Sequence, residues 1–152
     1  MNYLKISFVI FITLAITRFI PHPPNFTSLI ALSFYVPALL GIKYLPILLV
    51  GYVFTDLIIG THEVLFFTWG SVIFIGLIAK FFKNNILSRI FGSILGATIF
   101  FIVTNFGVWS TGYYPYTVDG LLLCYTLAIP FFGYSVISTF IFSGIIEIVY
   151  NS

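Results

Sequence analysis

The chain has 152 residues, of which 61% are hydrophobic and only 7% are charged. A soluble domain carries about a quarter charged residues, so this composition is typical of an integral membrane protein and leaves no hydrophilic block for a separate soluble domain. The formal net charge of +2 comes from six basic and four acidic side chains, which excludes the clustered Lys and Arg of a nucleic-acid-binding surface. We therefore expect one all-α integral membrane domain over residues 1–152.

Apolar segments separated by turn residues predict about six transmembrane helices in chain order. The segment Pro21–Phe26 (PHPPNF) ends the first helix, because proline lacks an N–H and restricts the residue before it. Pro37 should kink the second helix, and Pro130 should divide the last apolar region into a half-helix over 121–129 and a crossing helix. The predicted ranges of the six crossing helices are 4–20, 27–40, 46–60, 64–82, 87–103 and 131–149.

The fifth predicted helix carries small residues at a spacing that allows another helix to approach closely. After this helix comes Thr104–Asp119, a polar and aromatic segment interrupted by Gly107, Gly112 and Pro115. We expect it to form a long outer loop, because irregular backbone near a bilayer persists only where protein or water satisfies its polar groups. The small residues of the fifth helix are Gly92, Ser93, Gly96 and Ala97.

Basic residues fall mainly on one side of the predicted topology. With the N-terminus in the cytoplasm, only Arg18 lies on the outer side, which satisfies the positive-inside rule. An even number of crossings then places both termini of this multi-pass chain in the cytoplasm, and the outer loop 104–119 lies on the other side. The basic residues on the cytoplasmic side are Lys5, Lys43, Lys80, Lys83 and Arg89.

Arg18 and Asp56 lie inside apolar helices at a similar predicted depth near the outer face. A charge within a membrane is costly, so such residues pair with one another or face a cavity. A structural ion pair between the first and third helices and a polar clamp on a ligand are both open, and the two are compatible. Aromatic and polar residues gather at the same predicted face. The candidate ligand-binding residues are Arg18, His22, Asn25, Asp56, His62, Trp69, Asn105, Trp109, Tyr114, Tyr116 and Thr117.

Metal binding and catalysis have little support in the sequence. His22 and His62 lack the spacing of a metal motif, and Cys124 is the single cysteine. No G-x-S-x-G, HExxH or Gly-rich phosphate loop is present. We expect no metal, no cofactor and no enzymatic activity; the alternative is a small membrane enzyme that uses His62 with Asp56 or Glu63 as acid and base.

Four motifs carry a resemblance that covers nearly the whole chain. They are PHPPNF at 21–26, Gly-Thr-His at 60–62, TNFGVW at 104–109 and YPYT-x-x-GLLLCYTLAIPFF at 114–132. With them the chain resembles an uncharacterised family of small bacterial inner-membrane proteins. The resemblance implies a location in the bacterial inner membrane and no established activity.

The architecture also resembles the substrate-binding S component of energy-coupling-factor vitamin transporters. That resemblance implies a membrane-embedded subunit that captures a small, heterocyclic nutrient outside and docks on a transmembrane energising module with ATPases. In the first helix, Phe11 and Phe19 stand four residues from Ala15, so the small-x-x-x-small docking motif of that family is missing there. The alternative is a scaffold or assembly protein whose outer loops bind a partner subunit.

Overall fold

The computed structural model describes residues 3–152, which form an all-α fold with no strand among them. This confirms the all-α class expected from the sequence. The helices α1 and α3 begin and end within one residue of the predicted ranges, whereas α4 ends four residues before its predicted end at 82 and is followed by a 3₁₀ turn over Ala79–Phe81. The six helices are α1 (Tyr3–Phe19), α2 (Leu29–Tyr35), α3 (Leu45–Ile59), α4 (Leu65–Ile78), α5 (Ile86–Ser110) and α6 (Val118–Asn151).

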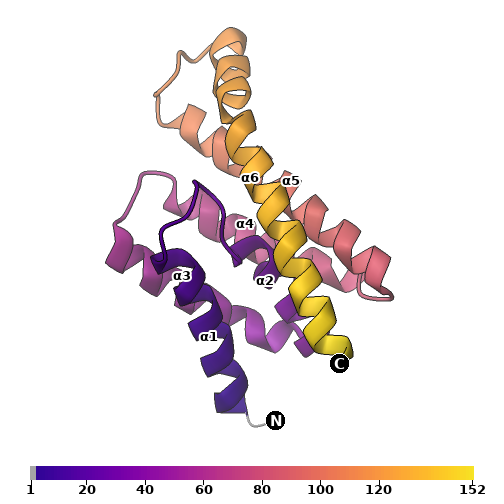
Figure 1. Cartoon of the computed structure of the whole chain (residues 1–152). Helices are drawn as coiled ribbons and strands as arrows, with labels where there is room; N and C mark the ends of the chain where they lie inside the picture. The colour runs from indigo at the N-terminus through magenta and orange to yellow at the C-terminus, as the bar shows by residue number, and fades with distance from the viewer. Residues whose placement is uncertain (1–2) are drawn as a thin grey trace.

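The connections between helices divide between the two ends of the molecule. The α1–α2, α3–α4 and α5–α6 connections lie at one end, opposite the start of α1 and the end of α6 (Figure 1). The hairpin of α5 and α6 projects beyond the other two connections (Figure 1). The end that holds these three connections is called the loop end below.

Helix α2 lies at the centre of the bundle. All seven of its residues are buried, and it packs against α4, α5 and α6. A helix that is apolar around its whole circumference is expected in such a central position. The kink expected at Pro37 takes the form of a π-helical turn over Val36–Leu40, which ends at Gly41.

The face of α5 that carries small residues packs closely against another helix, as predicted. Gly92, Ser93, Gly96 and Ala97 are all buried. A Cβ atom added at Gly92 would lie 2.5 Å from a ring carbon of Phe34 on α2, so only glycine allows this approach. The small-x-x-x-small spacing thus brings α5 against the central helix.

Helix α6 is continuous, which corrects the prediction that Pro130 divides it. Its 34 residues include Pro130 as an interior position, and helices in membranes tolerate proline where neighbouring groups satisfy the freed backbone. At about 1.5 Å per residue the helix is roughly 51 Å long. Its buried face consists of small and polar residues: Gly120, Cys124, Ala128, Ser135, Ser138, Thr139, Ser143 and Glu147.

Three helical segments of the described chain are long and apolar enough to cross a bilayer. The other apolar helices are shorter, and Leu29–Leu40 extends only roughly 18 Å, against about 30 Å for the hydrocarbon core. Six crossings therefore remain a prediction. The three long segments are Ile42–Ile59, Ile86–Ser110 and Val118–Asn151.

The prediction of a long outer loop over 104–119 is wrong in extent. Helix α5 continues to Ser110, and α6 begins at Val118, so only residues 111–117 connect them. The extension has a tertiary cause: Gly107 is buried, and a Cβ there would lie 2.6 Å from the ring of Phe67 on α4. Packing against α4 thus outweighs the weak helix propensity of this segment.

Candidate functional site

A buried polar triad joins α1, α3 and α4 near the loop end. Arg18 Nη2 donates to Asp56 Oδ1 at 2.6 Å, and Trp69 Nε1 donates to Asp56 Oδ2 at 2.8 Å. Asp56 is only 2% exposed. Both carboxylate oxygens therefore have a partner, and the ion pair expected between the first and third helices is confirmed.

The guanidinium of Arg18 retains hydrogen-bonding capacity beyond this pair. It lies 4.4 Å above the ring centroid of Tyr52, a cation–π contact between α1 and α3. Its Nη1 atom is buried and has no hydrogen-bond partner among the described residues. A buried donor without a partner costs about 1–3 kcal/mol.

A partly open cavity of about 490 Å³ lies beside the triad. Its size falls within the usual range of roughly 300–1,000 Å³ for small-molecule pockets. Residues from α1, α3, α4, α5, α6 and all three loop-end connections form its wall. They are Arg18, Pro24, Asn25, Tyr52, His62, Val64, Thr68, Phe100, Phe101, Thr104, Asn105, Val108, Tyr114, Cys124, Leu127, Ala128, Phe131, Phe132 and Ser135.

A second cavity of about 190 Å³ adjoins the first and extends toward α2. The two cavities have Arg18, Asn25, Tyr52 and Phe100 in common. Arg18 therefore stands between them, held in place by Asp56. The Arg18–Asp56 ion pair therefore has open space on two sides.

Aromatic rings form the apolar part of the large cavity. The rings of Phe101 on α5 and Phe132 on α6 lie 4.7 Å apart between centroids, with an interplanar angle of 31°. Tyr125 packs edge-on against Phe101, and its hydroxyl donates to the carbonyl of Ile102 at 2.6 Å. These contacts hold the α5–α6 hairpin together along the cavity wall.

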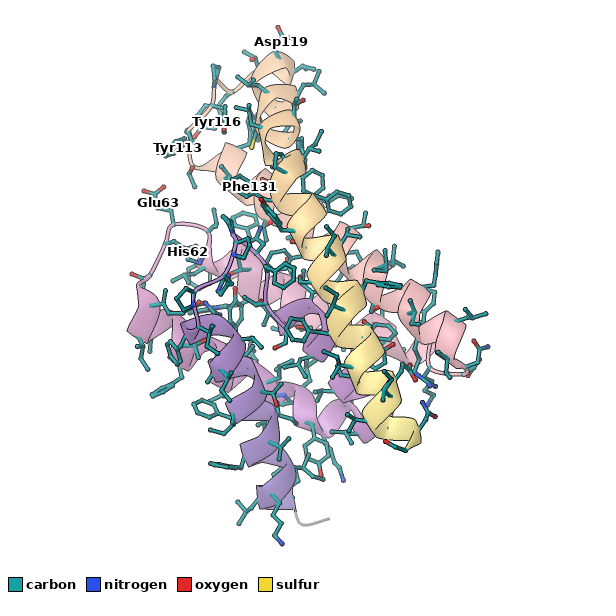
Figure 2. All side chains as sticks on the ribbon, viewed as in Figure 1. His62, Glu63, Tyr113, Tyr116, Asp119 and Phe131 are labelled. Atoms are coloured by element: carbon teal, nitrogen blue, oxygen red, sulfur yellow. The ribbon has the colours of Figure 1, made fainter. Side chains whose placement is uncertain are left out.

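Eight of the sequence-predicted residues meet at this site. Five line the large cavity, His22 lines the small one, and Asp56 and Trp69 lie behind Arg18. His62 lies on the α3–α4 connection (Figure 2). The five that line the large cavity are Arg18, Asn25, His62, Asn105 and Tyr114.

The other three predicted residues lie in the last turn of α5 (Trp109) and on the α5–α6 turn (Tyr116 and Thr117), and neither cavity includes them. Trp109 Nε1 donates to the carbonyl of Pro115 at 3.0 Å, and the Tyr116 hydroxyl donates to the carbonyl of Ser110 at 3.1 Å. Thr117 caps α6 by accepting a hydrogen bond from Gly120 N. Figure 2 shows Tyr116 on this connection, near the tip of the hairpin. Their observed contacts fix the turn.

Sequence reasoning missed several cavity residues, notably Tyr52, Thr68 and the phenylalanines of α5 and α6. One signal was available for Tyr52: it precedes Asp56 by four residues and so shares its helix face. Phe131 and Phe132 follow Pro130 directly. The sequence does not show whether an apolar residue of a membrane helix lines a cavity or faces lipid, because both positions favour the same residue types.

A second buried ion pair lies near the opposite end of the molecule. Arg89 Nε and Nη2 donate to Glu147 Oε1 and Oε2, each at 2.6 Å. The sequence assigns Arg89 only to the cytoplasmic side of the membrane and indicates no partner, whereas in the structure its side chain is only 9% exposed. Arg89 lies in the first turn of α5, from which its side chain reaches Glu147 on α6.

In the described part of the chain, histidine, cysteine and carboxylate side chains form no cluster of metal-binding type. Within residues 3–152, no group of three such side chains lies close enough to hold a metal ion. His22 Nδ1 lies 2.7 Å from the carbonyl of Pro23, within its own connection. The chemistry of the site is therefore hydrogen bonding and aromatic contact around the Arg18–Asp56 pair.

Comparison with known proteins assigns a family without a function. No curated protein matches the chain, and no solved structure matches it. One family model matches residues 2–151, which is nearly the whole sequence, and its description is a family of unknown function, DUF6580. The chain belongs to the family DUF6580.

Proposed function

We propose that this protein is a membrane-embedded subunit that binds a small heterocyclic nutrient for uptake. The observation that supports the proposal best is the cavity of about 490 Å³, bounded by Arg18, His62 and Asn105 at the loop end. Small-molecule sites are concave, mostly apolar and equipped with a few polar groups that orient the ligand. The cavity has all three properties.

The route of entry follows from the position of the cavity. All three loop-end connections contribute to its wall, through Asn25, His62 and Tyr114. In the predicted topology this end faces outward, because most basic residues lie at the opposite end. A molecule from outside would therefore reach Arg18 without crossing the bilayer.

Uptake requires an energy source that this chain does not contain. Its sequence has no phosphate-binding loop of the G-x-x-x-x-G-K-[ST] type. We propose that a transmembrane energising module with ATPases acts as a partner, as the resemblance to S components implies. The protein itself would bind and release the nutrient.

The decisive experiment is native extraction followed by mass spectrometry of small molecules that co-purify with the protein. Ala128→Phe adds a ring to the cavity wall, whereas Gly133→Phe adds the same ring on α6 where a Cβ meets nothing within 4 Å. The wild type and Gly133→Phe should retain the same small molecule, and Ala128→Phe should lose it. Circular dichroism and thermal unfolding would show that both variants are folded.

Two results would oppose the proposal. Equal retention in Ala128→Phe and Gly133→Phe would place the bound molecule outside the cavity. A protein partner that co-purifies in the absence of any small molecule would favour the scaffold alternative.

A further inference from the structure

A third open space lies on the outside of the bundle, between α1 and α3. It has a volume of about 470 Å³ and is called the α1–α3 groove below. The one hydroxyl in its described wall belongs to Ser7, and it donates to the carbonyl of Tyr3 at 2.8 Å within α1. The groove therefore presents an apolar surface. The other residues of the wall are Phe8, Phe11, Pro46, Ile47, Val50 and Gly51.

The groove opens onto a face that suits the acyl chains of a bilayer. Phe8 and Val50 in its wall are 65% and 68% exposed. The segment Ile42–Ile59, which includes α3, is long and apolar enough to cross a membrane. Side chains beside an empty space lose dispersion contacts, which a flexible hydrocarbon chain supplies. An acyl chain therefore fits the wall. Other large exposed apolar residues of α1 and α3 are Leu4, Ile12, Phe54 and Leu57.

Aromatic rings join α1 to the start of α3 at the end of the molecule away from the loop end. Tyr3 stacks on Tyr44 with 4.9 Å between the ring centroids. Lys43 Nζ lies 5.3 Å from the centroid of the Tyr44 ring. Tyrosine beside lysine is typical of the level of the lipid headgroups, where both side chains keep an apolar part in lipid and a polar tip in water. This end of the groove therefore suits the surface of a membrane.

Two lysines lie within one helical turn of the groove at this end. Lys5 precedes Phe8 by three residues, and Lys43 precedes Pro46 by three residues. Side chains at this spacing in a helix are neighbours, about 5–6 Å apart between Cβ atoms. Both lysines are exposed. Their ammonium groups stand on flexible stems and can meet a headgroup whose acyl chain occupies the groove.

No carboxylate side chain of the described residues is available to these two lysines. Two of the four carboxylates are paired with arginines, and the other two lie at the loop end, where Figure 2 labels Glu63 and Asp119. The anion that complements the lysines therefore comes from another molecule, and a membrane surface offers phosphate groups. The four acidic residues of the sequence are Asp56, Glu63, Asp119 and Glu147.

We propose that the α1–α3 groove binds an anionic glycerophospholipid from the leaflet that faces the cytoplasm in the predicted topology. One acyl chain lies along Phe8 and Val50, and the phosphate accepts hydrogen bonds from Lys5 and Lys43. Basic residues at the cytoplasmic surface attract anionic headgroups in this way. Only three residues of α1 are buried, so the lipid adds contacts that hold α1 against α3. The site is separate from the nutrient cavity and does not depend on it.

The test is titration of the purified, delipidated protein in an uncharged detergent, followed by native mass spectrometry. Dioleoyl phosphatidylglycerol and dioleoyl phosphatidylcholine form the matched pair, because their acyl chains are identical and only the first has a net negative charge. The first should bind about 25-fold more tightly, since each lysine near a surface contributes roughly a factor of five. Glycerol 3-phosphate carries the phosphate without acyl chains and should not bind, which separates a lipid headgroup from free phosphate.

A pair of double variants tests the headgroup contact. Lys5→Gln with Lys43→Gln should weaken phosphatidylglycerol binding about 25-fold and abolish its advantage over phosphatidylcholine. Lys80→Gln with Lys83→Gln is the matched control, because it removes two exposed positive charges at the α4–α5 connection, away from the groove. The control should change the affinity less than about twofold, as expected for a site without a shared partner.

A pair of tryptophan variants on α3 tests the position of the acyl chain. Val50→Trp places a large ring in the groove and should weaken phosphatidylglycerol binding roughly tenfold, which corresponds to about two methylene groups kept from burial. Leu57→Trp is the control, because Leu57 is exposed on the same helix and lies outside the groove. Both positions are exposed, so neither ring enters the core, and circular dichroism would verify the fold.

The outcomes separate a lipid site from its rivals. Equal affinity for the two phospholipids would show only non-specific lipid contact and would overturn the proposal, as would equal effects of the two lysine pairs or of the two tryptophan variants. A photo-crosslinker at position 50 that captures a transmembrane protein and no lipid would assign the groove to a partner helix instead. Ala128→Phe should leave phosphatidylglycerol binding unchanged, so failure of the nutrient proposal would not affect this result.

Discussion

Arg89 and Glu147 are 58 residues apart in the chain, yet they form a two-bond ion pair that joins the start of α5 to the end of α6. Arg89 Nη1 also donates to the carbonyl of Lys83, and Asn151 Nδ2 donates to Glu147 Oε2 at 3.1 Å. The pair lies at the end of the molecule opposite the cavities. It fixes one end of the α5–α6 hairpin, whose other end forms a cavity wall.

Removal of either member of this pair should destabilise the protein strongly. Arg89→Ala or Glu147→Ala leaves a buried charge without its partner, which typically costs about 3–5 kcal/mol. Arg89→Lys should recover little of that loss, because an ammonium group cannot form the two parallel bonds of a guanidinium. Thermal unfolding in detergent would measure each effect, with exposed Lys80→Ala as the control. A loss in Arg89→Ala no larger than in Lys80→Ala would contradict the prediction.

The Arg18–Asp56 pair should show energetic coupling. Arg18→Ala and Asp56→Ala should each lower the thermal unfolding temperature, since each leaves a charge at a buried site. The double variant should lose less than the sum of the single losses, because it removes both charges together. The measurement is a double-mutant cycle on the purified protein. Strict additivity would show that the two side chains do not interact in solution.

The two tryptophans should respond differently to the loss of their N–H groups. Trp69 donates to a buried carboxylate, and hydrogen bonds to charged groups contribute about 1.5–3 kcal/mol. Trp109 donates to a backbone carbonyl in an exposed turn, where about 0.5–1.5 kcal/mol or less is expected. Trp69→Phe should therefore lower the free energy of unfolding more than Trp109→Phe does. The reverse order would show that Asp56 does not need its second partner.

Gly120 at the start of α6 should not tolerate a side chain. A Cβ there would lie 2.1 Å from the carbonyl oxygen of Pro115, so Gly120→Ala must displace the 111–117 turn. Gly144→Ala provides the control, because its Cβ meets nothing within 4 Å and alanine favours a helix by about 1 kcal/mol. Thermal unfolding should show a loss for Gly120→Ala and none for Gly144→Ala. Equal stability of the two variants would contradict the close approach seen at the turn.

The predicted topology places the two ends of α5 on opposite sides of the membrane. Asn84→Cys and Tyr113→Cys introduce thiols at exposed positions before and after this helix, in a Cys124→Ser background. A membrane-impermeant maleimide applied from outside should label the Tyr113 position and leave the Asn84 position unlabelled. Labelling of both from the same side would overturn the assigned topology and the outward position of the cavities.

The sequence by itself determined the features that depend on local chemistry. The prolines of the PHPPNF segment end α1 because proline cannot continue a helix, and the spacing of Gly92 and Gly96 predicts a close helix contact without reference to the partner. The pairing of Arg18 with Asp56 was one of two compatible interpretations of the sequence, because two costly charges at similar depth pair with each other or face a cavity. In each case the physical cause lies in the residue itself or in its immediate spacing.

Tertiary structure decided the remainder. Helix α5 extends through Gly107 because α4 packs against it, and α6 continues through Pro130 within a packed hairpin. The Arg89–Glu147 pair and the cavity wall join residues that are distant in sequence, and no local spacing links them. Helix periodicity encodes which face of a helix is apolar, but in lipid both the buried and the outward face are apolar. The face that lines a cavity is therefore determined only by how the helices pack against one another.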